Sequence, residues 1–182
     1  MPHIELPHGT VRYLESGTGP PVVFLHGYLM GARLWDPVAH RLAGEFRCIV
    51  PELPFGAHPV PLNPAADLTS AGLGRLVADF LQALSLTGVI LAGNDSMALG
   101  AAAAIQEAGK VDQILLVGFD AISPARALMR EKRMLATVNQ HADQLAIYGI
   151  EYALEILKNS AIPGDRETPV HLVTAETLTA QP

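Results

Sequence analysis

The chain has 182 residues, of which 49% are hydrophobic and 16% charged, and its formal net charge is −6. This length and apolar content can fill the core of a domain, which argues against a disordered chain. The acidic balance and the absence of any Lys/Arg cluster argue against nucleic acid and membrane surfaces as partners. A single cysteine, Cys48, excludes an internal disulfide, and the histidines lack the paired spacing of metal sites. We therefore expect no metal and no cofactor.

The amino-terminal residues show no export pattern. Met1-Pro-His-Ile-Glu5 contains no charged stretch followed by an apolar stretch, and no apolar run approaches the roughly 18 residues of a membrane span. We expect a cytoplasmic protein, of the kind that recombinant expression produces.

Short apolar runs alternate with segments of helical period along the chain. Strands are predicted at 3–6, 11–15, 22–25, 47–50, 89–92, 113–117, 135–139 and 169–175. Helices are predicted at 34–43, 71–84, 96–108, 124–132 and 142–158. This alternation predicts one α/β domain over residues 1–182. We expect a three-layer sandwich with a single, mostly parallel sheet of about eight strands, an N-terminal hairpin and helices on both faces.

Two of the predicted helices carry more specific expectations. Thr69 or Ser70 is placed to cap the helix at 71–84. In the long helix at 142–158, we expect the apolar positions to face inward, against the sheet. These positions are Leu145, Ile150, Leu154 and Leu157.

The stretch from Leu91 to Gly100 (LAGNDSMALG) fits two different patterns at once. Gly93-x-Asp95 after an apolar strand is how an α/β-hydrolase with an aspartate nucleophile presents that residue. Asn94-Asp95-x-Met-Ala-Leu-Gly opens a helix as in the ribose-type periplasmic sugar-binding proteins. We therefore divide the domain into a hydrolase-like segment, 1–92, and a binding-protein-like segment, 93–182.

The front of the chain resembles the α/β-hydrolases close to haloalkane dehalogenases and epoxide hydrolases. The motifs are Val22–Tyr28, Leu34–Val38, Pro51–Gly56 and Val89–Asp95. The resemblance implies Asp95 as the nucleophile, with the backbone amides of Tyr28 and Ser96 as oxyanion donors. The chain departs from the family at Met97, because the turn that carries the nucleophile has a glycine at this position in the family. It also lacks a histidine after the last predicted strand, which would act as the general base. There is no room in the sequence for a cap domain that would exclude water. We therefore expect that the protein is not a working enzyme.

The back of the chain resembles the C-terminal lobe of the ribose-type binding proteins. The motifs are Asn94–Gly100, Val117–Asp120 and Ala136–Gln140. The resemblance implies that Asn94, Asp120 and Gln140 bind sugar hydroxyls. The carboxyl ends of strands are also where open α/β sheets bind ligands. The same residues have structural alternatives: Asn94 or Asp95 as a helix cap, Asp120 as the cap of the helix near Pro124, and Gln140 as a strand-end polar group.

Segments that resemble two different families and join at one shared dipeptide are typical of an engineered or recombined chain rather than of natural evolution. We interpret the chain as a designed or recombined scaffold without evolved activity, in which fragments of two α/β folds share one sheet. Two alternatives remain open: a crippled hydrolase that cleaves esters slowly through Asp95, and a weak monosaccharide binder. The expected partners are a weakly bound sugar or ester and, through imperfect packing, a second copy of the chain.

Overall fold

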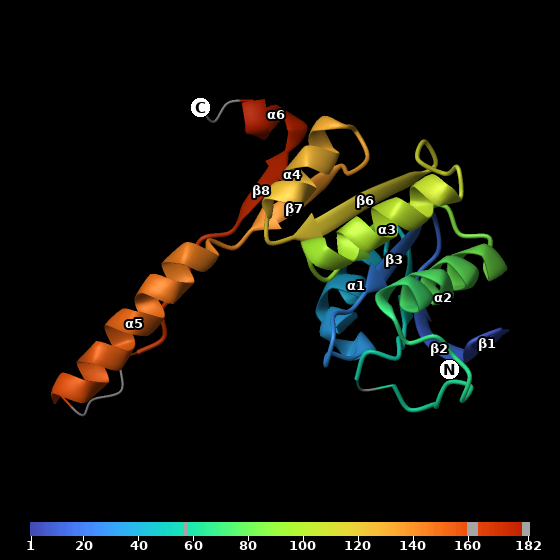
Figure 1. Ribbon diagram of the computed structural model, residues 1–182, viewed down its shortest axis with the longest axis horizontal. Coiled ribbons are helices and arrows are strands. Elements are labelled where there is room, and N and C mark those ends of the chain that lie inside the picture. Colours follow the sequence, from blue (N-terminus) through green and yellow to red (C-terminus); the bar gives the residue numbers. More distant parts are fainter. Residues whose placement is uncertain (57, 160–163, 180–182) are drawn as a thin grey trace.

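One eight-stranded mixed sheet forms the centre of the computed structural model, which describes residues 1–56, 58–159 and 164–179 (Figure 1). The strand order is β1-β2-β4-β3-β5-β6-β7-β8. The strands are β1 His3–Leu6, β2 Gly9–Ser16, β3 Pro21–Leu25, β4 Arg47–Pro51, β5 Gly88–Ala92, β6 Ile114–Phe119, β7 Ala136–Asn139 and β8 His171–Thr174. The pairs from β4 through β3, β5 and β6 to β7 are parallel, and the pairs β1/β2, β2/β4 and β7/β8 are antiparallel. The predicted α/β class, N-terminal hairpin and continuous sheet are confirmed.

Helices lie on both faces of the sheet, as predicted. The helical elements are the 3₁₀ turn Ala32–Trp35 and the helices α1 Asp36–Leu42, α2 Ser70–Ala83, α3 Asp95–Glu107, α4 Ser123–Arg130, α5 Ala142–Asn159 and α6 Ala175–Thr179. On one face, β3, β5 and β6 form the main core with α2, α3 and α4. On the other face, Val22, Phe24 and Cys48 form a smaller core with the 3₁₀ turn and α1.

The last strand is shorter than the sequence indicates. Residues 169–175 were predicted as one strand, but β8 covers only His171–Thr174, and α6 begins at Ala175. The amide of Thr174 donates a hydrogen bond to Thr177 Oγ1 at 2.8 Å, and the Thr177 hydroxyl donates to the Thr174 carbonyl at 3.0 Å. Such local side-chain bonds compete with strand pairing and turn the backbone into a helix.

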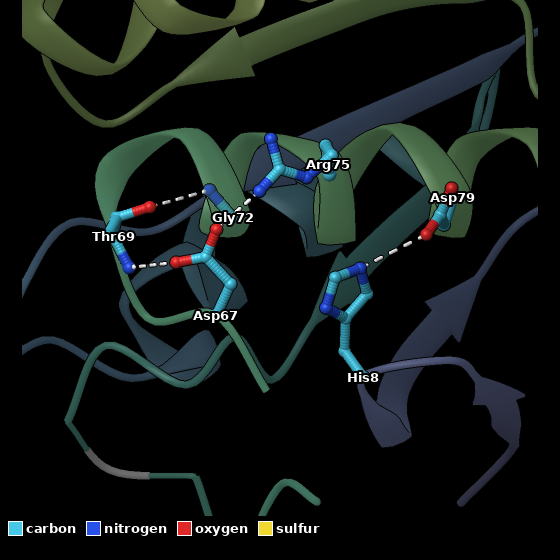
Figure 2. A network of polar contacts seen from close by, with 6 residues as sticks. All are labelled: His8, Asp67, Thr69, Gly72, Arg75 and Asp79. Carbon is cyan, nitrogen blue, oxygen red and sulfur yellow. Dashed lines mark hydrogen bonds and ion pairs between the residues drawn. The ribbon is translucent and has the colours of Figure 1, made fainter. Parts of the chain in front are cut away.

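The start of α2 is held by a local network of polar contacts (Figure 2). Thr69 Oγ1 accepts a hydrogen bond from the Gly72 amide at 3.2 Å, which confirms Thr69 as the cap. Asp67 Oδ1 in turn accepts from the Thr69 amide at 2.9 Å. A Cβ on Gly72 would lie 2.0 Å from the Asp67 carbonyl oxygen, so this turn requires glycine.

An ion pair and a histidine–carboxylate contact lie beside this network (Figure 2). Arg75, one turn into α2, contacts the second carboxylate oxygen of Asp67. His8, in the turn between β1 and β2, lies 3.2 Å from the carboxylate of Asp79. The N-terminal hairpin is thereby attached to the helix that covers the main core.

The long helix α5 differs from its prediction. It extends away from the sheet (orange in Figure 1), and the side chains predicted to face inward, at Leu145, Ile150, Leu154 and Leu157, are between 42% and 81% exposed. The prediction of their burial was wrong. An apolar period in a sequence indicates that a helix has an apolar face, but it does not specify which surface covers that face.

Candidate functional site

Three polar residues follow the ends of three adjacent parallel strands. Asn94 follows β5, Asp120 follows β6 and Gln140 follows β7. Because the carboxyl ends of these strands lie at one edge of the sheet, the three residues share that edge. Gln140 Nε2 donates a hydrogen bond to Asp120 Oδ1 at 2.5 Å. The two side chains therefore form a directly bonded carboxylate–amide pair, and both are only partly buried.

Asn94 is the N-terminal cap of α3. Its backbone is extended, and its Oδ1 accepts a hydrogen bond from the Met97 amide at 2.9 Å. Its Nδ2 faces the turn after β3: a Cβ built on Gly27 in that turn would lie 4.0 Å from this nitrogen. The amide oxygen of Asn94 is used in capping, so its nitrogen is the group that can donate a hydrogen bond to a ligand.

Asp95, the first residue of α3, is fully buried and connects three elements. Thr137 Oγ1 of β7 donates to its Oδ1 at 2.7 Å, and the Ile122 amide before α4 donates to its Oδ2 at 2.9 Å. A Cβ on Gly118 of β6 would lie 2.2 Å from the same Oδ1. Only glycine at this position leaves space for the carboxylate. Burial raises the pKa of Asp95, and the hydrogen bonds from Thr137 and Ile122 oppose that rise.

The loop after β6 has a strained backbone that this network supports. Asp120 and Ala121 have φ angles of 112° and 57°, in the left-handed region that side chains disfavour. The Ala121 amide donates to Thr137 Oγ1 at 3.2 Å, and Arg126 Nε donates to the Ala121 carbonyl at 2.9 Å. Asp95 and Thr137 thus position Asp120. The predicted cap role of Asp120 is not seen, because Ile122 occupies the cap position of α4.

Sequence reasoning did not single out Thr137. The one available signal is that it lies between apolar residues in a predicted strand, where a buried hydroxyl needs a hydrogen-bond partner. Its partners, Asp95 and Ala121, are distant in sequence, so no spacing pattern points to them.

The turn after β3 is supported by a buried histidine. His26 Nε2 accepts a hydrogen bond from the Leu53 amide at 3.0 Å, which leaves the ring proton on Nδ1, 3.1 Å from the Gly27 carbonyl oxygen. Burial lowers the pKa of His26, so the ring stays neutral near pH 7. The turn packs closely on the strand end beside it: a Cβ on Gly93 would lie 3.2 Å from the Gly27 nitrogen.

Tyr28 and Ser96, together with Asn94, line a groove between α2 and α3. The groove has a volume of about 680 Å³ and is lined mainly by apolar side chains, including Leu73, Val77 and Ala101. Both Tyr28 and Ser96 are exposed, whereas the carboxylate of Asp95 is engaged inside the protein. The structure therefore places Tyr28, Ser96 and Asn94 in the lining of one groove, and the catalytic roles of Tyr28, Ser96 and Asp95 stay predictions.

Among residues 1–56, 58–159 and 164–179, no group of three or more His, Cys, Asp or Glu side chains is arranged to hold a metal ion. Within the same ranges, every helix is too short or too polar to span a bilayer.

Residues 60–161 match the family model of the periplasmic binding protein domain, which is more than half of the 182 residues. The chain belongs to this family. It is 43% identical over 90 residues to a D-ribose/D-allose-binding protein of Pseudomonas aeruginosa, an alignment that covers 47% of this chain and 28% of that protein. The chain thus matches less than a third of that relative's length.

Other similarities extend the comparison. A periplasmic solute-binding protein of Actinobacillus succinogenes with bound D-allose has the same fold, at a TM-score of 0.66 and 22% identity, over 88% of this chain and 54% of that one. Haloalkane dehalogenase 2 of Mycobacterium tuberculosis is 27% identical over 110 residues, which covers 59% of this chain and 38% of the dehalogenase. Resemblance to both groups is confirmed. The family match begins at residue 60, inside the segment assigned to the hydrolase, and the boundary after residue 92 stays a prediction.

Proposed function

We propose that the strand edge formed by Asn94, Asp120 and Gln140 binds the hydroxyl groups of a monosaccharide. The observation that carries this proposal is the bonded Asp120–Gln140 pair at the ends of β6 and β7, with Asn94 at the end of the neighbouring strand β5. The Asp120 carboxylate accepts hydrogen bonds, the Asn94 nitrogen donates, and the Gln140 amide both donates and accepts. A hydroxyl also donates and accepts, so the three side chains match a row of hydroxyls. The D-ribose/D-allose-binding relative and the allose-bound structure support the sugar class.

The affinity expected from these three side chains is low. Each hydrogen bond replaces one made with water and contributes about 0.5–1.5 kcal/mol net. Association itself costs at least about 4 kcal/mol. We therefore expect a dissociation constant in the millimolar range or weaker.

A titration with D-ribose followed through backbone amide shifts tests this proposal. The expected result is saturable shifts confined to Gly93–Met97, Phe119–Ile122 and Asn139–His141. Gln140→Ala should weaken binding about threefold to tenfold, since it removes one of the amide groups. Glu107→Gln, at the far end of α3, is the matched control and should bind like the parent. Shifts that map elsewhere, or that are the same in Gln140→Ala as in the parent, would overturn the proposal.

We propose further that residues 1–92 act as a scaffold and that the chain joins parts of two families at Asn94–Asp95. Similarity to both the binding proteins and a dehalogenase supports this origin. The buried position of Asp95 favours a structural role over attack on a substrate, because both of its oxygens accept hydrogen bonds from the protein. Turnover of a chromogenic ester provides the test. The expected rate equals the background, and a rate that disappears in Asp95→Asn would favour the hydrolase alternative.

A further inference from the structure

Part of one sheet face is apolar and uncovered. Along β6, the side chains of Ile114 and Leu116 are buried under the helices of the main core, whereas Leu115 between them points to the other face and is 51% exposed. The strand registers place the neighbouring residues of β7 and β8 on that same face, and Leu172 of β8 is 61% exposed. We call this surface the open sheet face. Its residues are Leu115, Val117, Phe119, Val138 and Leu172.

A second uncovered surface lies on α5. Ile147, Ile150, Leu154 and Leu157 follow the i, i+3, i+7, i+10 spacing of a single helix face, and all four are exposed. We call them the α5 stripe. The helix has 18 residues, about 27 Å at 1.5 Å per residue, which is long enough to cross several strands.

Contacts at the base of α5 join it to the segment that returns to β8. Thr168 Oγ1 donates to the Gln140 carbonyl at 3.2 Å, and the rings of His141 and His171 meet with their nitrogens 2.6 Å apart. These contacts join the entry of α5 to the return of the chain into β8, so the helix leaves the sheet in a defined direction (Figure 1).

The returning segment is also attached along the helix. The Tyr152 hydroxyl donates to the Gly164 carbonyl at 2.6 Å, and the Arg166 guanidinium lies 3.7 Å from the centre of the Tyr148 ring. Arg166 Nη1 donates to Glu151 Oε2 at 2.7 Å. The helix and this segment therefore form one projecting arm.

We propose that two copies of the chain exchange these arms, with the α5 stripe of each copy packed on the open sheet face of the other. The chain carries two exposed apolar surfaces of complementary type, a helix stripe and a sheet face, and in a pair each can cover the other. A two-fold axis makes the same contact twice, which closes the assembly as a dimer. This inference does not depend on sugar binding, because neither surface includes the three strand-edge side chains.

Substitutions on each surface test the exchange. Ile150→Glu places a charge in the α5 stripe, and Leu115→Glu places one in the open sheet face; both positions are exposed, so the fold tolerates them. Ile156→Glu is the matched control, because Ile156 is exposed and lies about 140° around the helix from the centre of the stripe. Light scattering and sedimentation equilibrium should find a parent dimer of twice the 19.3 kDa chain mass. Each test variant should dissociate at least about tenfold more readily than the parent, and the control should not.

A mixing experiment separates exchange from other arrangements. Ile150→Glu retains an intact sheet face and Leu115→Glu retains an intact stripe, so a mixture can form one good contact. We expect the mixture to recover a dimer that neither variant forms alone at the same concentration. A parent that stays monomeric would overturn the proposal, because α5 would then remain exposed or fold onto its own sheet. Loss of the dimer in Ile150→Glu but not in Leu115→Glu would also overturn it, because the helices would then pair with each other.

Discussion

The two ends of the parallel sheet share one hydrogen-bond ladder but differ in how they are covered. Around β3, both faces are buried: Phe24 packs under the 3₁₀ turn and α1, while Val23 faces α2 and the main core. From β6 to β8, helices bury one face, and Leu115 and Leu172 are exposed on the other. Strands β5 and β6 nevertheless pair in regular register across the Asn94–Asp95 junction. Strand pairing is thus regular across the junction, whereas the helices cover only one face of the sheet beyond it. Pairing needs only strands of matching direction.

The largest expected effect contrasts two neighbouring residues of β6. Leu116→Ala removes a side chain buried in the main core and should lower the free energy of unfolding by about 2–5 kcal/mol. Leu115→Ala acts on the open sheet face and should change it by less than about 1 kcal/mol in the monomer. Urea denaturation at low protein concentration measures both values. Similar losses for the two variants would mean that the open sheet face is covered even in the monomer.

The next effect concerns the junction itself. Asp95→Ala leaves the Thr137 hydroxyl and the Ile122 amide without their carboxylate partner, and should destabilise the protein by about 2–3 kcal/mol. Ser96→Ala, at the exposed neighbouring position, is the matched control and should stay within about 0.5 kcal/mol of the parent. Chemical denaturation gives both values. An Asp95→Ala protein as stable as the parent would show that this carboxylate does not join the two parts of the sheet.

The smallest effect is a pH dependence carried by the same carboxyl. Because burial raises its pKa in the folded state, the folded protein holds a proton that the unfolded chain has released. The contribution of Asp95 to stability therefore falls as the pH rises above the ordinary aspartate pKa of about 3.9 and through the raised value. Asp95→Asn lacks this titration.

Urea midpoints of Asp95→Asn and the parent, measured from about pH 4 to about pH 7, test this sign. The midpoint of the variant should rise relative to that of the parent as the pH increases. The opposite trend would mean that the hydrogen bonds from Thr137 and Ile122 outweigh burial and lower the pKa.

Much of the fold is predictable from local patterns. Apolar runs and turn residues indicate every strand, and Thr69 is recognisable as a cap because its hydroxyl serves an amide three residues away. Such signals lie within one element. The position of α5 is not predictable in this way, since its apolar residues are consistent with any apolar partner surface.

The candidate site shows the same limit. The ends of predicted parallel strands indicate that Asn94, Asp120 and Gln140 share an edge, and the structure places them there. The partners of Asp95 lie 27 and 42 residues away, at Ile122 and Thr137, so its role in the loop after β6 is visible only in three dimensions. Gly118 is a related case, because its lack of a side chain makes room for a carboxylate from another element.

Native-state hydrogen exchange tests most directly whether the chain forms one cooperative sheet across the Asn94–Asp95 junction. We expect the slowest amides of β3, β5 and β6 to exchange with the same opening free energy, equal to that of global unfolding, and to respond alike to added denaturant. Amides of β3 and β4 that open with one free energy, while those of β6 and β7 open with another, would contradict it. The two parts of the chain would then be separate cooperative units that only lie side by side.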